Sequence, residues 1–270
     1  MVNYARRIST MSYTADVVRN LFGAMTDPNI ISFGGGAPAK EALPVDILRQ
    51  LTDEVVVKDK RGVEALQYGP IGGTQDMKEI IVNELLAPKG VKCTTDNVMV
   101  VAGGLEGINL ICQVYIDPGD VILVESPTFV HTVEIFDMFE AKCVAVDMDD
   151  NGICTDDLEA KIQQYHPKMI YVIPTFQNPS GRTLSLERRT QVAELAAKYD
   201  VLVLEDDPYR DIRYSGEDLP PIKCFDTTGN VVVANSFSKI FSPGVRLGYV
   251  MAEPEVIQYL LEVKSATNSH

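Results

Sequence analysis

The order of secondary structure is decided by one stretch in the middle of the chain: MIYVI at 169–173, SLERRTQVAELAAK at 185–198 and VLVLE at 201–205. The first and last runs are almost wholly apolar, as in strands buried on both faces of a mostly parallel sheet. The run between them has apolar residues at helical spacing, with Ser185 as a candidate N-cap and Glu187 in its first turn. One face of this helix is predicted to hold Leu186, Val192, Leu195, Ala196 and Tyr199. A strand, a helix and a strand in this order predict an α/β fold.

Similar apolar runs recur on both sides of this stretch. The predicted strands are Val98–Ala102, Val121–Glu125, Cys143–Asp147, Met169–Ile173, Val201–Glu205, Val231–Asn235 and Leu247–Met251. Further helices are predicted around Thr14–Met25, from about Leu105 to Tyr115, and from Glu253 to Ser265. The chain is therefore predicted to form one mostly parallel sheet with helices packed on it.

Composition is that of a globular protein. The chain has 270 residues, 46% of them hydrophobic and 23% charged, which is enough for a sizeable core. The formal net charge of -14 argues against nucleic-acid binding, because a chain this acidic repels phosphate groups. Apolar runs such as Val121–Val124 are far shorter than the ~20 residues of a membrane-spanning helix. No apolar segment follows the basic N-terminus, so we expect no signal peptide and predict a cytoplasmic protein that binds no membrane.

Cysteine and histidine usage argues against structural metal and disulfides. The five cysteines, which include no Cys-x-x-Cys pair, are Cys93, Cys112, Cys143, Cys154 and Cys224. This pattern predicts buried, reduced thiols in a cytosolic protein. The histidines, His131, His166 and His270, are too few for a His-rich site, and no bound metal is predicted.

Unusual residues follow four of the predicted strands, at the sheet edge where ligands bind in open α/β folds. The loop Ala102–Gly107 is rich in glycine and opens a helix, so its N–H groups could hold a phosphate, or its glycines could serve tight packing. It has neither the GxGxxG spacing of a dinucleotide site nor the Lys of a P-loop. In the loop Pro174–Gly181, Asn178 could face a ligand or cap its own turn. The glycine-rich stretch Phe33–Pro38 could approach a ligand closely or form a flexible turn.

The other two loops carry acids and a lysine. The acids at Glu205–Asp207 end an apolar strand, which is costly unless they are paired, bind a metal or face a cationic ring nitrogen. In the segment Asn235–Gly248, burial and the nearby charge of Arg246 would lower the pKa of the Lys239 amine and make it nucleophilic. A solvated surface lysine is the ordinary alternative. Ser236 and Lys239 also have the Ser-x-x-Lys spacing of penicillin-binding acyl-enzymes, but the Lys-Thr-Gly motif that those enzymes need is absent.

Six motifs taken together resemble one family, the fold-type I pyridoxal-phosphate enzymes of aminotransferase class I/II. In the family's order they are Ile31–Pro38 (ISFGGGAP), Gln67–Gly73 (QYGPIGG), Glu125–Phe129 (ESPTF), Gln177–Gly181 (QNPSG), Glu205–Tyr209 (EDDPY) and Ser236–Gly248 (SFSKIFSPGVRLG). The branch that looks most similar is that of the 2-aminoadipate, kynurenine and aromatic aminotransferases. The resemblance covers the chain from about Ile30 to its end. It implies a three-layer α/β/α large domain with a mostly parallel seven-stranded sheet, and pyridoxal 5'-phosphate as the cofactor.

The resemblance also implies roles for individual residues, and the catalytic ones are Lys239, Asp206 and Tyr209. Lys239 would form the internal aldimine and then move a proton between the substrate Cα and the cofactor C4′. Asp206 would keep the pyridine nitrogen protonated, so that the ring can take up electrons. Asn178 and Tyr209 would hydrogen-bond the phenolic oxygen, and Asn178 would also contact the substrate. Phe129 would stack on the ring, where the family often has Tyr.

The cofactor phosphate would lie at the start of a helix. Its donors would be the N–H groups of Gly104 and Leu105. Close relatives usually carry Ser and Gln at these two positions, so the backbone donors remain while side-chain hydrogen bonds are lost. Ser236, Ser238 and the guanidinium of Arg246 would surround the same phosphate.

The remaining implications concern the substrate, a second subunit and the domains. Tyr68 would reach the phosphate from a partner subunit, which implies a homodimer with shared active sites. Gly36 would lie near the substrate carboxylate. The family's Arg that clamps this carboxylate has no match in the sequence, so the resemblance implies cofactor binding and leaves turnover by these 270 residues open. The division implied is an N-terminal arm at 1–45, the large cofactor domain at 46–252 and the start of the interdomain helix at 253–270, with the small C-terminal domain missing or truncated.

The predicted activity is transfer of an amino group from an amino acid to a 2-oxo acid, in two half-reactions (ping-pong) through pyridoxamine phosphate. Two alternatives stay open. A β-lyase would use the same residues, because the substrate pocket decides between the two reactions. A cofactor-binding sensor domain of a transcription regulator would need a winged-helix domain first, for which the N-terminus is short, and the net charge of -14 argues against DNA binding.

Overall fold

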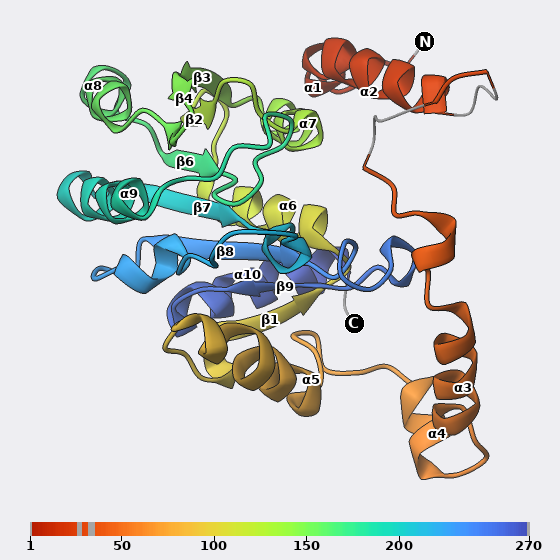
Figure 1. Ribbon diagram of the computed structural model, residues 1–270. Coiled ribbons are helices and arrows are strands. Elements are labelled where there is room, and N and C mark those ends of the chain that lie inside the picture. Colours follow the sequence, from red (N-terminus) through yellow and green to blue (C-terminus); the bar gives the residue numbers. More distant parts are fainter. Residues whose placement is uncertain (1, 26–28, 32–35, 269–270) are drawn as a thin grey trace.

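Seven strands form the central sheet of the computed structural model, which describes residues 2–25, 29–31 and 36–268 (Figure 1). They are β1 (Val98–Val101), β2 (Val121–Glu125), β3 (Lys142–Val146), β6 (Met169–Val172), β7 (Leu202–Asp206), β8 (Val231–Ser236) and β9 (Gly248–Met251). Their order is β1-β9-β8-β7-β6-β2-β3. The strands from β8 to β3 run parallel, and β9 is antiparallel to both of its neighbours. Every strand lies within one residue of its predicted bounds, and the mostly parallel sheet is confirmed.

Helices connect these strands and form the N-terminal segment. In the described part of the chain they are α1 (Arg7–Thr10), α2 (Ser12–Met25), α3 (Val45–Val55), α4 (Lys60–Ala65), α5 (Gln75–Ile80), α6 (Gly104–Tyr115), α7 (Val130–Met138), α8 (Thr155–Tyr165), α9 (Leu186–Tyr199) and α10 (Pro254–Thr267). Short 3-10 helices are η1 (Lys40–Ala42), η3 (Ala87–Lys89), η4 (Thr95–Asn97), η5 (Arg210–Ile212), η6 (Ile222–Phe225) and η7 (Pro243–Val245), and η2 (Ile81–Leu86) is a π-helix that follows α5 directly. A small hairpin pairs β4 (Met148–Asp149) with β5 (Gly152–Ile153). Ser185 caps α9, as predicted, by accepting a hydrogen bond from the N–H of Arg188.

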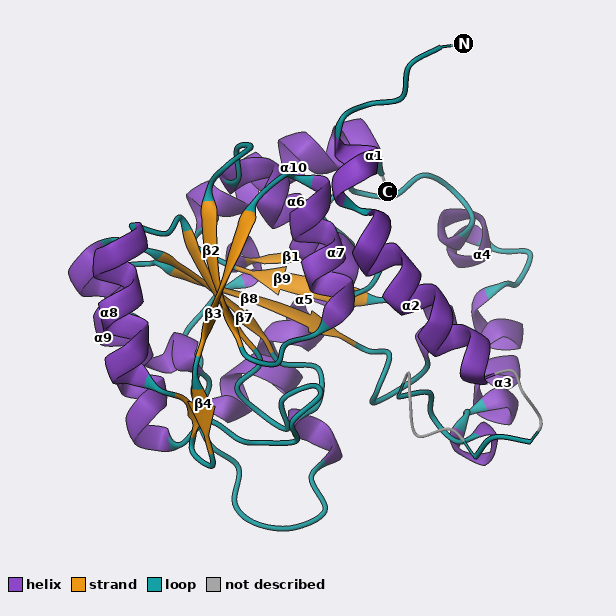
Figure 2. Cartoon of the chain, turned by 90° about the horizontal axis from the view of Figure 1, so that it is seen from above, coloured by secondary structure: helices purple, strands orange, loops and turns teal. Residues whose placement is uncertain are grey.

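Both faces of the sheet are covered by helices (Figure 2). On one face, α6, α7 and α10 pack on alternate strand residues such as Met169 and Tyr171 of β6. On the other face, α8 and α9 pack on the residues between them, such as Ile170 and Val172. The π-helix η2 covers this second face near β1. Because both faces are buried, the central strands are apolar throughout, and the three-layer α/β/α arrangement follows.

Two expectations about burial are wrong. Leu186 is 47% exposed, because it is the first residue of α9 and the buried face of this helix begins at Arg189. Cys143 is an exposed residue, because β3 is the last strand of the sheet and pairs on one side only. All five cysteines are free thiols; Cys112 is buried as expected, whereas Cys93, Cys154 and Cys224 are only half-buried.

Arg189 lies on the buried face of α9, where no charged residue was predicted, and its side chain is fully buried. Its guanidinium donates hydrogen bonds to Leu184 O (2.9 Å), Pro220 O (3.1 Å), Pro174 O (2.8 Å) and Thr175 Oγ1 (3.0 Å). Three of these acceptors lie in the loop 174–184. The side chain therefore fixes the loop that carries Asn178.

Replacing this side chain is expected to cost about 3 kcal/mol of unfolding free energy, measured by denaturant unfolding. Arg189→Met keeps the length of the side chain but leaves buried oxygens without donors. Arg182→Met is the control: that side chain is 36% exposed, lies 3.6 Å from the fully exposed Asp150 and should contribute less than about 1 kcal/mol. Equal losses in the two variants would contradict the structural role of Arg189.

The N-terminal segment packs on the sheet domain through α7. The hydroxyls of Thr10 and Thr14 donate to the backbone oxygen and to Oδ2 of Asp137, at 2.9 Å each. Arg6 forms an ion pair with Glu140 at 2.5 Å. Helices α3 and α4 pack on each other and stand beside the sheet (Figure 1). Among the described residues no helix has the length and apolar character needed to cross a membrane.

Candidate active site

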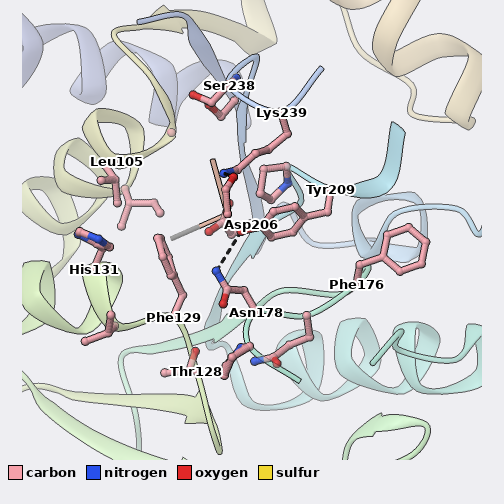
Figure 3. A pocket seen from close by; sticks show the side chains of 18 of the residues that line it. Leu105, Thr128, Phe129, His131, Phe176, Asn178, Asp206, Tyr209, Ser238 and Lys239 are labelled. Carbon is pink, nitrogen blue, oxygen red and sulfur yellow. Dashed lines mark hydrogen bonds between the residues drawn. The ribbon is translucent and has the colours of Figure 1, made fainter. Parts of the chain in front are cut away.

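A cavity of about 790 Å³ opens at the carboxyl ends of β7 and β8 (Figure 3). This is the edge at which open α/β sheets bind their ligands. The predicted site residues that line it are Gly36, Gly104, Leu105, Phe129, Asn178, Asp206, Tyr209, Ser236, Ser238, Lys239 and Arg246. They come from widely separated parts of the sequence, so it is the fold that brings them together.

Two predicted features lie elsewhere. Tyr68 does not line the cavity, and 78% of its surface is exposed. Its predicted role concerns the site of a second subunit, so it stays a prediction. Of the glycine-rich stretch, Ser32–Gly35 lie outside the described residues, whereas Gly36 lies at the cavity with φ +58.

Asp206 is the last residue of β7 and is only 6% exposed. Its Oδ2 accepts a hydrogen bond of 2.7 Å from the hydroxyl of Tyr171, on the neighbouring strand β6. Burial raises the pKa of Asp206 to about 7, although the Tyr171 hydrogen bond lowers it. Sequence reasoning missed Tyr171, because a tyrosine within a buried strand is ordinary core material.

The two neighbours of Asp206 have structural roles. Glu205 is fully buried and accepts the N–H groups of Ile222 (2.8 Å) and Lys223 (3.0 Å) at the start of η6. Asp207 forms a buried ion pair of 2.8 Å with Arg210. Successive residues of a strand point to opposite faces, so Glu205 points away from Asp206. Within the described residues, no group of His, Cys, Asp and Glu is arranged to hold a metal ion.

Lys239 follows β8 and reaches into the cavity. Its Nζ donates a hydrogen bond of 2.8 Å to the backbone oxygen of Gly36 and lies 5.9 Å from the centre of the Tyr209 ring. Burial lowers the pKa of the Lys239 amine. We expected the charge of Arg246 to help lower the pKa of Lys239, but burial accounts for the lower pKa. The guanidinium of Arg246 donates instead to Ala102 O at 3.0 Å.

Asn178 and Tyr209 meet across the cavity, as the dashed line in Figure 3 shows. The amide Nδ2 of Asn178 donates to the Tyr209 hydroxyl at 3.0 Å. Burial raises the pKa of this hydroxyl, which therefore stays protonated at neutral pH. Its own proton remains available to an acceptor in the cavity.

The helix α6 begins at the opposite side of the cavity. Gly104 and Leu105 form its first turn, where N–H groups have no partner within the helix. The hydroxyl of Ser236 donates to that of Ser238 at 2.8 Å, and both residues line the same side as Gly104. This set of backbone N–H groups, hydroxyls and a nearby guanidinium is suited to an anion.

Gly248 lets the loops that contain Gly103 and Asn235 approach each other closely. It is the first residue of β9 and pairs with Ser236 on one side and Val101 on the other. A Cβ atom at this position would lie 2.6 Å from Asn235 O and 2.9 Å from the carbonyl carbon of Gly103. Both of these atoms belong to backbone, which cannot turn away as a side chain could. Only glycine therefore fits here without moving the loops.

Gly248→Ala is accordingly expected to lower the free energy of unfolding by about 3 kcal/mol, the cost of overpacking at a rigid site. Denaturant unfolding measures the loss. Gly244→Ala is the matched control, because an added Cβ there would meet only the Ser242 hydroxyl at an ordinary 3.7 Å. The control should change stability by less than about 1 kcal/mol. A harmless Gly248→Ala substitution would show that the two loops do not need this close approach.

The cavity wall is largely apolar on the side of α7. The rings of Phe129 and His131 lie 5.3 Å apart between centres, and Phe176 lines the cavity from the loop after β6. Sequence reasoning named Phe129 but missed His131 and Phe176. The spacing Phe129-x-His131 at the start of a helix was the available signal.

The comparisons with known proteins agree with this geometry. The family model of aminotransferase class I and II matches residues 28–270. The chain belongs to this family. It is 37% identical over 259 residues to aromatic-amino-acid aminotransferase 1 of Thermococcus litoralis, covering 94% of this chain and 62% of that protein. Its fold matches the solved structure of the kynurenine aminotransferase of Pyrococcus horikoshii with a TM-score of 0.87 and 34% identity, covering 94% of this chain and 63% of the other. These relatives belong to the predicted branch of the family.

A third relative has a different function by name. An uncharacterized HTH-type transcriptional regulator of Bacillus subtilis is 28% identical over 240 residues, covering 89% of this chain and 49% of the regulator. The chain thus spans about three fifths of the two aminotransferases and half of the regulator.

Proposed function

We propose that this chain binds pyridoxal 5′-phosphate and transfers an amino group from an amino acid to a 2-oxo acid. The observation that carries the proposal is one cavity in which Lys239 and a buried carboxyl group, Asp206, lie opposite the N-terminus of α6. This matches the three demands of the cofactor, which are an amine for its aldehyde, an anion for its ring nitrogen and donors for its phosphate.

The residues present fit the cofactor. Oδ2 of Asp206 is held by Tyr171, and within the described residues nothing donates to its Oδ1. The Tyr209 hydroxyl has a proton to donate, and the first N–H groups of α6 lack partners within the helix. When bound, pyridoxal phosphate supplies an aldehyde for an amine and a ring that takes up electrons from the substrate Cα.

Each side chain then has a defined task. Lys239, whose pKa burial lowers, holds the cofactor covalently at Nζ and, once released, carries a proton to and from the substrate Cα. Asp206 keeps a proton on the ring nitrogen, because a cation beside a carboxylate is stabilised in a buried site. Asn178 and Tyr209 hydrogen-bond the phenolic oxygen, and Phe129 covers one face of the ring. The same cation would lower the pKa of Asp206 from about 7.

The anion side and the substrate side complete the proposal. The N–H groups of Gly104 and Leu105 hold the phosphate together with Ser236 and Ser238. Arg246 would join them by giving up its hydrogen bond to Ala102.

We also propose three assignments that concern the substrate, a second subunit and the domains. Gly36 and Asn178 border the space for the substrate. Tyr68 serves the site of a second subunit in a homodimer. The chain divides into an N-terminal arm at 1–45, a cofactor domain at 46–252 and the start of an interdomain helix at 253–270.

A second candidate function is a cofactor-binding sensor, which the similarity to HTH-type regulators favours. Such a domain would bind the cofactor and an amino acid without repeated turnover. A β-lyase is distinguished by its products, because it converts a β-substituted amino acid into the released β-substituent, ammonia and a 2-oxo acid.

The test follows each half-reaction separately. The purified chain with bound cofactor is mixed with an aromatic amino acid, 2-aminoadipate or glutamate, and the released 2-oxo acid is counted. We expect one 2-oxo acid per site without an acceptor, and continued release only after a second 2-oxo acid is added. Bound cofactor without any released 2-oxo acid would favour the sensor, and release of ammonia from a β-substituted amino acid, tested in parallel, would favour the lyase. Either result would overturn the proposed transfer.

A further inference from the structure

Two buried hydroxyl groups form a chain that ends on Asp206. The Tyr171 hydroxyl donates to Asp206 Oδ2 at 2.7 Å, and Thr132 Oγ1 lies 3.1 Å from the Tyr171 oxygen. A phenol has a single proton, and that proton is used on Asp206. Thr132 must therefore donate to the Tyr171 oxygen. Both hydroxyl groups therefore donate in the direction of the carboxylate, and each of these hydrogen bonds strengthens the next.

Packing alone gives no reason for these hydroxyls. Tyr171 and Thr132 are both fully buried, and the Tyr171 ring packs edge-on against Phe136 at 5.6 Å in an apolar core. Phenylalanine and valine would fill the same two volumes. Replacing both members of a buried polar pair with apolar groups of the same shape is close to neutral for stability. The hydroxyls are therefore accounted for by what they do to Asp206.

We propose that Tyr171 is a positioning residue for Asp206 and that Thr132 acts through Tyr171. Tyr171 occupies Oδ2 and favours the ionised carboxylate, which leaves Oδ1 for the cationic group that the cavity receives. Thr132 lies on α7, which begins directly after Phe129, so the two hydroxyl groups also connect the wall of the cavity with Asp206. The identity of the cation as the cofactor's ring nitrogen rests on the proposed function, whereas the coupling of the three side chains does not.

The surroundings of Asp206 make this hydrogen bond important. Burial and the negative charge of Asp207 oppose ionisation of Asp206, and the Tyr171 hydrogen bond favours it. Glu125 on β2 is a second buried acid, whose pKa burial raises to about 8. Burial and the negative charge of Asp206 raise the pKa of the Tyr209 hydroxyl. Among these neighbours, Tyr171 is the one that donates to the carboxylate.

The first test needs no cofactor. Because Tyr171 stabilises the ionised form, the loss of Tm caused by Tyr171→Phe, relative to the unsubstituted chain, should be larger at pH 9 than at pH 5 by about 4 °C or more. Tyr199→Phe is the matched control, because its hydroxyl also donates to a carboxylate, Glu159, at 2.7 Å. Hydrogen bonds from Lys198 and Tyr199 lower the pKa of Glu159, so the control's effect should stay constant from pH 5 to 9. Glu125 titrates in the same range, so the comparison is repeated in the Glu125→Gln background.

The second test measures the dissociation constant of pyridoxal phosphate. We expect Tyr171→Phe to weaken binding about tenfold at pH 7.5, the size of one charge-assisted hydrogen bond, and to shift the pH profile of binding to higher pH. Thr132→Val should weaken binding about threefold. The double variant should bind within twofold of Tyr171→Phe, because Thr132 acts only through Tyr171.

Two results would overturn the proposal: a Tm difference for Tyr171→Phe that is independent of pH, or effects on binding that multiply in the double variant. A chain that binds no pyridoxal phosphate at all would defeat the proposed function, and the cofactor-free melting experiment would still decide the coupling.

Discussion

Lys239→Ala is expected to abolish the visible absorption band of a cofactor held through a lysine, and to reduce amino-group transfer by about 10³-fold or more. The variant loses both the amine that captures the cofactor aldehyde and the group that moves the proton at the substrate Cα. The structure leaves no substitute nearby, because among the described residues Lys239 is the lysine that lines the cavity. Absorption spectra and transfer rates of the purified variant measure the two effects.

A matched control separates this role from loss of a positive charge. Lys198→Ala removes a lysine that pairs with Glu159 at 2.6 Å on the surface, and it should leave the band and the rate unchanged. Lys239→Ala is also expected to leave folding intact, since Lys239 makes one hydrogen bond, to Gly36 O. A Lys239→Ala variant that keeps the band would show that a different lysine holds the cofactor.

Asp206→Ala is expected to reduce the transfer rate by about 10³-fold and to weaken cofactor binding by a smaller factor, about 10- to 100-fold. The carboxylate matters most when charge develops on the ring, whereas binding also uses Lys239 and the start of α6. Transfer rates at saturating cofactor, compared with the dissociation constant, separate the two effects. A rate within tenfold of the unsubstituted chain would remove Asp206 from its proposed role.

The same carboxyl group should destabilise the cofactor-free protein at high pH. Its folded pKa is about 7, against an ordinary value of 3.8. Between these values the unfolded chain releases a proton that the folded chain keeps, so stability falls as pH rises through this range. A difference of roughly three pH units corresponds to about 4 kcal/mol. Asp206→Asn should therefore unfold at higher denaturant concentration than the unsubstituted chain at pH 8, with little difference at pH 4.

The order of strands and helices could be predicted from the sequence because the sheet is buried on both faces. Such strands contain short apolar runs, and helices between them have capping residues such as Ser185. The predictions of burial that were wrong concern residues whose burial depends on distant parts of the chain. Leu186 is apolar but lies at the exposed start of its helix, and Arg189 is charged but is buried by the oxygens of two loops.

The residues of the candidate site that belong to sequence motifs could be predicted. Lys239 and Asp206 stand at strand ends in recognisable segments, and the cavity contains both. The hydroxyl chain was not predictable, because Thr132 and Tyr171 are 39 residues apart and look like core residues. The position of Arg246 was not predictable either, since its hydrogen bond to Ala102 depends on packing between β9 and the loop after β1.

The most direct measurement is chemical trapping of the cofactor on the chain. The purified protein is loaded with pyridoxal phosphate, reduced with borohydride and digested, and the modified lysine is located by mass spectrometry. We expect one pyridoxyl group per chain, on Lys239. A label on another lysine such as Lys89 or Lys223, or one spread over many lysines with Lys239 unmodified, would contradict the assignment of the site.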